Sequence, residues 1–284
     1  MYKLDLGGWS DFEGALQQVN DTQQERTGRS GRPFRDPLFR GVGSSKSGLE
    51  TTLERSYPSE RCDATASLLK YYRKIGASKP AIETFSGRRW DRLPEFPEFE
   101  KLVKDNFSTY TWLDMLLVHT PDIYEYLVYL RHHGFPSPLL DWSASPYVAA
   151  FFAFDSPDRD AERVAVYAFL QDTIHGGSSK AHLFILGQYL RSDPRHLLQQ
   201  CRYSMCAAVD LGKDDYLFRP HQSGLSNATG PEGELFEITM PVEERLAALK
   251  HLDLMNINAF SLFGSDDSLV RTIARRELLF RDWP

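Results

Sequence analysis

The chain has 284 residues, of which 42% are hydrophobic and 13% aromatic, so it can bury a sizeable core and is not a disordered chain. Its net charge of −6 argues against a protein that coats nucleic acid through general phosphate contacts. Three cysteines without a CxxC pair exclude a disulfide scaffold and a zinc ribbon.

The amino-terminal segment is predicted to contain a helix, a polar loop and a strand. Residues 9–19 have the apolar spacing of a short amphipathic helix. Residues 20–36 are polar and rich in Gly and Arg, which predicts a mobile loop. Residues 38–40 are predicted as a strand that breaks at a Gly-rich turn over 41–45. This segment carries a local cluster of positive charge at Arg26, Arg29, Arg32, Arg35 and Arg40.

Helical and strand patterns alternate along the rest of the chain. Prolines at 80, 94 and 97 predict a loop over 80–97, Gly134 is a natural end for one helix, and Ser145-Pro146 is a natural start for another. The predicted helices are 59–75, 98–107, 122–133, 147–154, 192–200 and 267–278, with one more opening at 241–245, and the predicted strands are 139–141, 164–170, 203–209 and 235–240. This order predicts an α+β fold with a mixed central sheet of short strands and peripheral helices. We expect a single domain over residues 1–284 with its core at about 8–280.

The first candidate site is Phe39-Arg40-Gly41. An arginine at a strand end beside a Gly-rich turn suits a phosphate, because its planar fork donates two hydrogen bonds and the glycines let backbone N–H groups approach the anion. The structural alternative is an arginine that pairs with a carboxylate.

The second candidate site runs from His132 to Ser143. Two histidines end a helix, and a short apolar strand then leads through Asp141-Trp142-Ser143 into the next helix, a place where ligands are often bound. Adjacent helical histidines point about 100° apart, which disfavours a shared metal ion. The structural alternative is a helix-capping histidine, with Asp141 orienting His132 or His133.

Two further segments carry polar groups near predicted strands. Gln199 and Gln200 lie at a helix-to-strand junction, where a buried amide needs a backbone or ligand partner. Glu232 and Glu234 precede a strand and suit acid–base work or a ribose, although a solvated loop is the more common outcome. Cys201 has no matched base nearby in the sequence.

These segments together resemble the FRG-domain family, which is named for its Phe/Tyr-Arg-Gly motif. The resemblance is carried by Phe39-Arg40-Gly41, His132-His133-Gly134, Leu139-Leu140-Asp141-Trp142-Ser143, the segment 147–153, Gln199-Gln200 and the tail 257–263. It extends over about residues 8–280. Ser137-Pro138 stand where the family often has Thr-Arg, so a second phosphate contact is not expected at that point.

The order of an arginine strand, a hydroxyl residue and a late glutamine also resembles the layout of ADP-ribosyltransferases, an analogy between patterns. It implies that Arg40 grips NAD, that Ser143 holds the nicotinamide ribose, and that Gln199 or its rival Glu234 contacts the 2′-hydroxyl. The full set of implied NAD-binding residues is Phe39, Arg40, Gly41, His132, Asp141, Trp142 and Ser143. NAD would be a substrate, and no metal is expected.

Three functions follow as alternatives. The first is an ADP-ribosyltransferase-like bacterial toxin or phage-defence effector that modifies nucleic acid or protein and has an antitoxin or inhibitor as a partner. The second is a non-catalytic module that binds a nucleotide or nucleic acid. The third is a metal-dependent nuclease that uses His132, Asp141 and His221. The sequence contains no apolar leader or long apolar run, so we expect a cytoplasmic protein without membrane partners.

Overall fold

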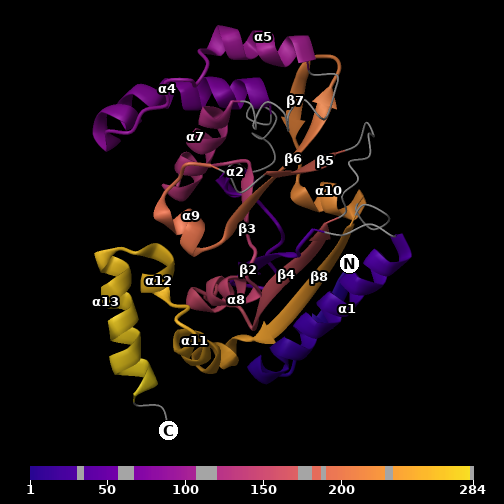
Figure 1. Cartoon of the computed structure of the whole chain (residues 1–284), viewed down its shortest axis with the longest axis vertical. Helices are drawn as coiled ribbons and strands as arrows, with labels where there is room; N and C mark the ends of the chain where they lie inside the picture. Colours follow the sequence, from indigo (N-terminus) through magenta and orange to yellow (C-terminus); the bar gives the residue numbers. More distant parts are fainter. Residues whose placement is uncertain are drawn as a thin grey trace.

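Eight strands form one mixed sheet in the described part of the chain (Figure 1). The computed structural model describes residues 1–30, 35–56, 67–106, 120–171, 181–186, 190–227 and 233–281. The strands are β1 (Tyr2–Asp5), β2 (Leu38–Val42), β3 (Leu139–Ser143), β4 (Arg163–Gln171), β5 (His182–Leu186), β6 (Cys201–Asp210), β7 (Asp215–Phe218) and β8 (Gly233–Pro241). Their order is β1-β8-β4-β2-β3-β6-β5, and β7 also pairs with β6. The predicted α+β class with a mixed sheet is confirmed.

The helices lie around this sheet (Figure 1). They are α1 (Phe12–Ser30), α2 (Thr52–Ser56), α4 (Leu68–Ser86), α5 (Phe96–Asn106), α7 (Pro121–His132), α8 (Pro146–Asp155), α9 (Pro194–Leu198), α10 (His221–Asn227), α11 (Arg245–Leu254), α12 (Ala259–Phe263) and α13 (Asp266–Arg275), with short turns η1 (Trp9–Asp11), η2 (Val242–Glu244) and η3 (Arg276–Phe280). Among the described residues, no helix combines the length and apolarity needed to cross a bilayer.

β2 and β3 share fewer paired residues than the other neighbouring strands of the sheet. β1 runs parallel to β8 and the other pairs are antiparallel, with four or more paired positions in most of them. β2 and β3 share the single pair Phe39 and Ser143. The two strands therefore separate on either side of this pair.

Two large apolar clusters occupy the same face of the sheet, one on each side of the junction between β2 and β3. One packs α4, α5 and α7 against β3 and β6. The other packs α1, α8, α11 and α12 against β2, β4 and β8. Alternation along β3 and β4 sends Trp142 and Phe169 to the opposite face, into a third cluster.

Two predicted loops are helical in the structure. The helix predicted at 9–19 continues as α1 to Ser30, so the loop predicted over 20–36 is wrong up to that residue. Polar pairs one turn apart, such as Gln17 with Asp21 and Arg29 with Glu25, stabilise a helix without apolar spacing. Residues 31–34 lie outside the described part.

The loop predicted over 80–97 is likewise shorter than expected. α4 passes through Pro80 and ends at Gly87, which has a φ of +70° and donates its N–H to the Glu83 carbonyl. One proline removes one helical hydrogen bond, and the packing of the preceding turn, with Tyr72 and Ile75 buried, holds the helix together. The beginning of the helix predicted at 59–75 falls on residues 57–66, outside the described part. The helix predicted at 192–200 is confined to α9.

Candidate functional site

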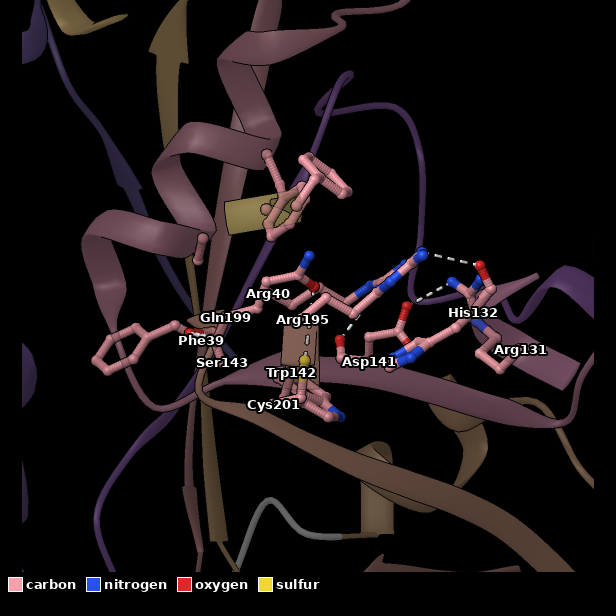
Figure 2. Close-up of a pocket in the computed structure, with 14 residues that line it drawn as sticks. Phe39, Arg40, Arg131, His132, Asp141, Trp142, Ser143, Arg195, Gln199 and Cys201 are labelled. Atoms are coloured by element: carbon pink, nitrogen blue, oxygen red, sulfur yellow. Dashed lines mark hydrogen bonds and ion pairs between the residues drawn. The ribbon is translucent and has the colours of Figure 1, made fainter. Parts of the chain in front are cut away.

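A pocket of about 340 Å³ opens at the β2–β3 junction, between the two apolar clusters (Figure 2). Its walls come from β2, β3, α7, α8, α12 and the segment from α9 into β6. The lining residues are Phe39, Arg40, Gly41, Arg131, His132, Asp141, Trp142, Ser143, Ala149, Phe152, Arg195, Gln199, Cys201 and Phe263. The volume lies at the small end of the range of about 300–1,000 Å³ for small-molecule sites.

Arg40 lies where β2 and β3 separate. Its Nη1 donates to the main-chain carbonyl of Asp141 over 2.7 Å, two residues along β3 from the one β2–β3 pair. The Arg40 guanidinium thus bonds a main-chain carbonyl of β3 at the point where β3 is no longer paired with β2. Burial lowers the pKa of Arg40 to about 10, and the Asp141 charge partly offsets this effect, so the group stays charged at neutral pH.

Two more arginines face the same pocket. Arg131 Nη2 donates to Asp141 Oδ2 over 2.5 Å, and Arg195 Nη1 donates to the His132 carbonyl over 3.2 Å (Figure 2). Burial lowers the pKa of His132 to about 4, so its imidazole is neutral at pH 7. The charged side chains that line the pocket are therefore three arginines and one aspartate, which leaves an excess of two positive charges.

The pocket also gathers buried polar atoms that lack a hydrogen-bond partner within the described structure. They are Nε of Arg40, Arg131 and Arg195, Nδ1 of His132 and Oδ1 of Asp141. Such groups are rare in folded proteins because each costs about 1–3 kcal/mol. Their concentration in one place is typical of a site arranged for binding rather than for stability.

His132 is hydrogen-bonded to Tyr203, which is hydrogen-bonded in turn to His196. The Tyr203 hydroxyl lies 2.8 Å from His132 Nε2 and 3.2 Å from His196 Nδ1. His196 and the ring of Tyr203 are buried. These hydrogen bonds fix the orientation of the His132 ring at the pocket wall.

The structure brings Ser143 and Gln199 to the pocket, but their polar groups bond other parts of the protein. Ser143 Oγ donates to the Gln199 carbonyl over 2.8 Å and accepts from the Ser145 N–H over 3.0 Å. Gln199 Nε2 donates to the Leu262 carbonyl over 3.0 Å, and its Oε1 lies 3.6 Å from Cys201 Sγ. Both side chains therefore tie β3, α8 and α12 to the segment that opens β6.

Gly41 lies inside β2, and the Gly-rich turn predicted to begin there starts later. A Cβ at this position would stand 1.8 Å from the Ala149 carbonyl oxygen and 2.7 Å from the Ala153 N. The glycine is required because the backbone of α8 packs directly on β2. Phe39 beside it is buried in the cluster that contains α8, and Figure 2 shows its ring pointing away from Arg131 and His132.

Trp142 and Glu234 contribute less to the pocket than the sequence suggested. The Trp142 indole donates to Ser204 Oγ over 2.8 Å in the cluster on the other face of the sheet. Glu234 is paired with Arg26 of α1 at 3.4 Å and is not among the lining residues. The structure does not bring Glu234 together with Arg40.

The residues of the nuclease alternative are not gathered either. His221 is buried at the start of α10 and does not line the pocket with His132 and Asp141. Within the described ranges, no group of three His, Cys, Asp or Glu side chains is placed to hold a metal ion. Burial raises the pKa of the Cys201 thiol to about 12, so it lines the pocket as a neutral thiol.

Four lining residues with charged or aromatic side chains were missed by the sequence reasoning: Arg131, Arg195, Phe152 and Phe263. The sequence predicted no second phosphate contact, because Ser137-Pro138 stand where the FRG-domain family often has Thr-Arg. Arg131 and Arg195 place two further guanidinium groups at the pocket instead. A weak signal existed for each, because all four lie in or beside segments already singled out. Nothing in the spacing showed that these segments meet.

Comparison with known proteins agrees with the motif. The family model of the FRG domain matches residues 35–162, the part that contains β2, α7, β3 and α8 and with them most of the pocket. No curated protein matches the chain. No solved structure matches it either. The matched segment, residues 35–162, contains the Phe39-Arg40-Gly41 and Leu139-Leu140-Asp141-Trp142-Ser143 motifs, so this part of the chain is similar to the FRG domain.

Proposed function

We propose that the pocket binds a phosphate-bearing nucleotide and that NAD is the nucleotide it uses. The observation that carries this proposal is that three arginines and a single carboxylate, Asp141, line one pocket. Arg40, Arg131 and Arg195 each use one terminal nitrogen in the bonds described above, and among the described residues the other terminal nitrogen has no hydrogen-bond partner. Guanidinium forks of this kind match the geometry of phosphate oxygens.

The electrostatics support an anionic ligand. Half-buried positive charges without matching negative charges destabilise a fold, and an anion placed among them removes that penalty. The size of the pocket suits one nucleotide half of NAD better than a folded nucleic acid. The overall charge of −6 leaves this pocket as a local positive site on an acidic protein.

The reaction we propose is ADP-ribosyl transfer of the kind implied by the family's resemblance to ADP-ribosyltransferases. The bond between the nicotinamide nitrogen and ribose C1′ breaks, nicotinamide leaves with the bonding electrons, and an acceptor nucleophile bonds C1′ and loses its proton. Asp141 is the carboxylate of the pocket, and its negative charge would stabilise the cationic C1′ centre. The acceptor would be a protein or a nucleic acid, as expected for a toxin or phage-defence effector.

A nucleotide-binding module without catalysis is the second candidate. It is favoured by the internal hydrogen bonds of Ser143 and Gln199, which engage the polar groups that the transferase analogy needs for the ribose. A module of this kind would bind NAD or a related nucleotide and release no nicotinamide.

Calorimetry with NAD and a nicotinamide-release assay with lysate, DNA and RNA acceptors separate these candidates. We expect Arg40→Gln and Arg195→Gln to weaken NAD binding by about tenfold or more, since a hydrogen bond to a charged group contributes about 1.5–3 kcal/mol. Arg29→Gln is the matched control, because Arg29 is exposed on α1 and pairs with Glu25. Binding with nicotinamide release supports the enzyme, and binding without release supports the module. Failure of the wild-type protein to bind NAD at millimolar concentration refutes the proposal.

A further inference from the structure

The pocket has an aromatic side in addition to its cationic side. Phe152 of α8 and Phe263 of α12 line it, and both rings are partly exposed. Their centroids lie 6.0 Å apart with the ring planes at 90°. Two perpendicular rings offer one face and one edge to a further planar group, an arrangement that aromatic rings prefer.

The two sides come from different parts of the fold. Arg131 and His132 end α7, which belongs to the apolar cluster on one side of the β2–β3 junction. Phe152 and Phe263 pack against the cluster on the other side. Figure 1 shows the same arrangement, with α7 on one side of β2 and β3 and α8 with α12 on the other. A ligand that spans the pocket meets positive charge at one end and aromatic rings at the other.

The aromatic side is held in place by specific bonds. Gln199 Nε2 donates to the Leu262 carbonyl, one residue before Phe263. The Arg271 guanidinium lies 5.6 Å from the Phe263 ring centroid and pairs with Asp155 at the end of α8 at 3.2 Å. Gln199, which the sequence suggested as a ribose ligand, therefore acts as a residue that positions the Phe263 wall.

We infer that Phe152 and Phe263 form the subsite for the aromatic base of the nucleotide, so that the pocket selects a base-bearing phosphate ligand over a plain sugar phosphate. This inference rests on the proposed function and adds the recognition of the base to it. Stacking of a base on an aromatic side chain is worth enough to change affinity by about tenfold. Phe152 lies within the segment that matches the FRG domain and Phe263 lies beyond it, so both parts of the chain contribute to the base subsite.

The test compares three probes by calorimetry: AMP, nicotinamide mononucleotide and ribose 5-phosphate. We expect the wild-type protein to bind at least one of the two nucleotides about tenfold more tightly than ribose 5-phosphate. Phe263→Leu should remove this difference while leaving the affinity for ribose 5-phosphate unchanged. Phe260→Leu is the control on the same helix, because Phe260 is 46% exposed and does not line the pocket.

The outcomes distinguish this inference from the proposed function. Arg195→Gln should weaken all three probes, because it acts on the phosphate. Equal affinity of the wild-type protein for all three probes overturns the base subsite and leaves the phosphate site standing. A wild-type protein that binds NAD but none of the three probes also overturns the base subsite, and one that binds neither NAD nor the probes overturns both proposals. If Phe263→Leu lowers the melting temperature strongly, Phe152→Leu serves as the second variant with the same expected loss of nucleotide preference.

Discussion

Substitution of Gly41 by alanine should destabilise the fold, because the new Cβ meets main-chain atoms that cannot rotate away. The Cβ would stand 1.8 Å from the Ala149 carbonyl oxygen, although real Cβ contacts are essentially never under 3.0 Å. Helix α8 would have to move away from β2 by at least 1.2 Å, which would also disturb the Ala153 contact at 2.7 Å. Overpacking of this kind costs about 1–3 kcal/mol where side chains can adjust, and we expect about 3 kcal/mol here.

Urea denaturation followed by circular dichroism measures this loss. With a typical slope for a chain of this size, 3 kcal/mol lowers the midpoint by about 1 M. The control is Gly14→Ala in α1, where a Cβ meets no atom within 4 Å and alanine should stabilise the helix by up to about 1 kcal/mol. A Gly41→Ala protein as stable as the wild type would show that α8 does not pack on β2 in this way.

Two further predictions concern buried titratable groups. His221 is 1% exposed and burial lowers its pKa to about 3, well below the value of about 6.5 expected in the unfolded chain, so the unfolded state binds more protons between these pH values. The free energy of unfolding should therefore fall by about 2 kcal/mol between pH 7 and pH 5 because of this residue alone. In urea denaturation, the stability of His221→Leu should depend correspondingly less on pH. A variant with the same pH dependence as the wild type would refute the role of His221. Burial raises the pKa values of the Cys201 and Cys206 thiols to about 12, so in a Cys62→Ser variant neither should react with a thiol-specific disulfide reagent at pH 8 until the protein is denatured; rapid labelling of the folded protein would contradict this.

The parts of the fold that the sequence predicted are those with local signals. Ser145 accepts a hydrogen bond from the Val148 N–H and Pro146 follows it, so adjacent residues determine where α8 begins. The end of α7 also has a local signal, since Gly134 adopts a φ of +84°, which favours glycine just after a helix. The strands β1, β5 and β7 were missed because they are defined by pairing with distant partners, β8 and β6, rather than by local signals.

The site could be predicted only in part. Phe39-Arg40-Gly41 and the segment from His132 to Ser143 were identified as candidates, and the sheet places them together because β2 and β3 are neighbours. Arg195 and Phe263 come from distant segments, and no spacing rule selects them from the other arginines and phenylalanines. The buried Gln199 amide needed a partner, and the sequence left open whether that partner was backbone or ligand; the backbone at Leu262 fills this role.

The pairing of β1 with β8 sets the order in which the sheet can assemble. Tyr2 to Asp5 pair with Phe236 to Thr239, so β1 cannot pair until β8, a strand far along the chain, has been synthesised. β8 also completes the ladder of β4 from Arg163 to Gln171. Contacts between such distant residues slow folding and prolong the lifetime of unpaired strands in the nascent chain. The nascent chain therefore holds an incomplete sheet, in which β1 and one edge of β4 are unpaired, until β8 has been synthesised.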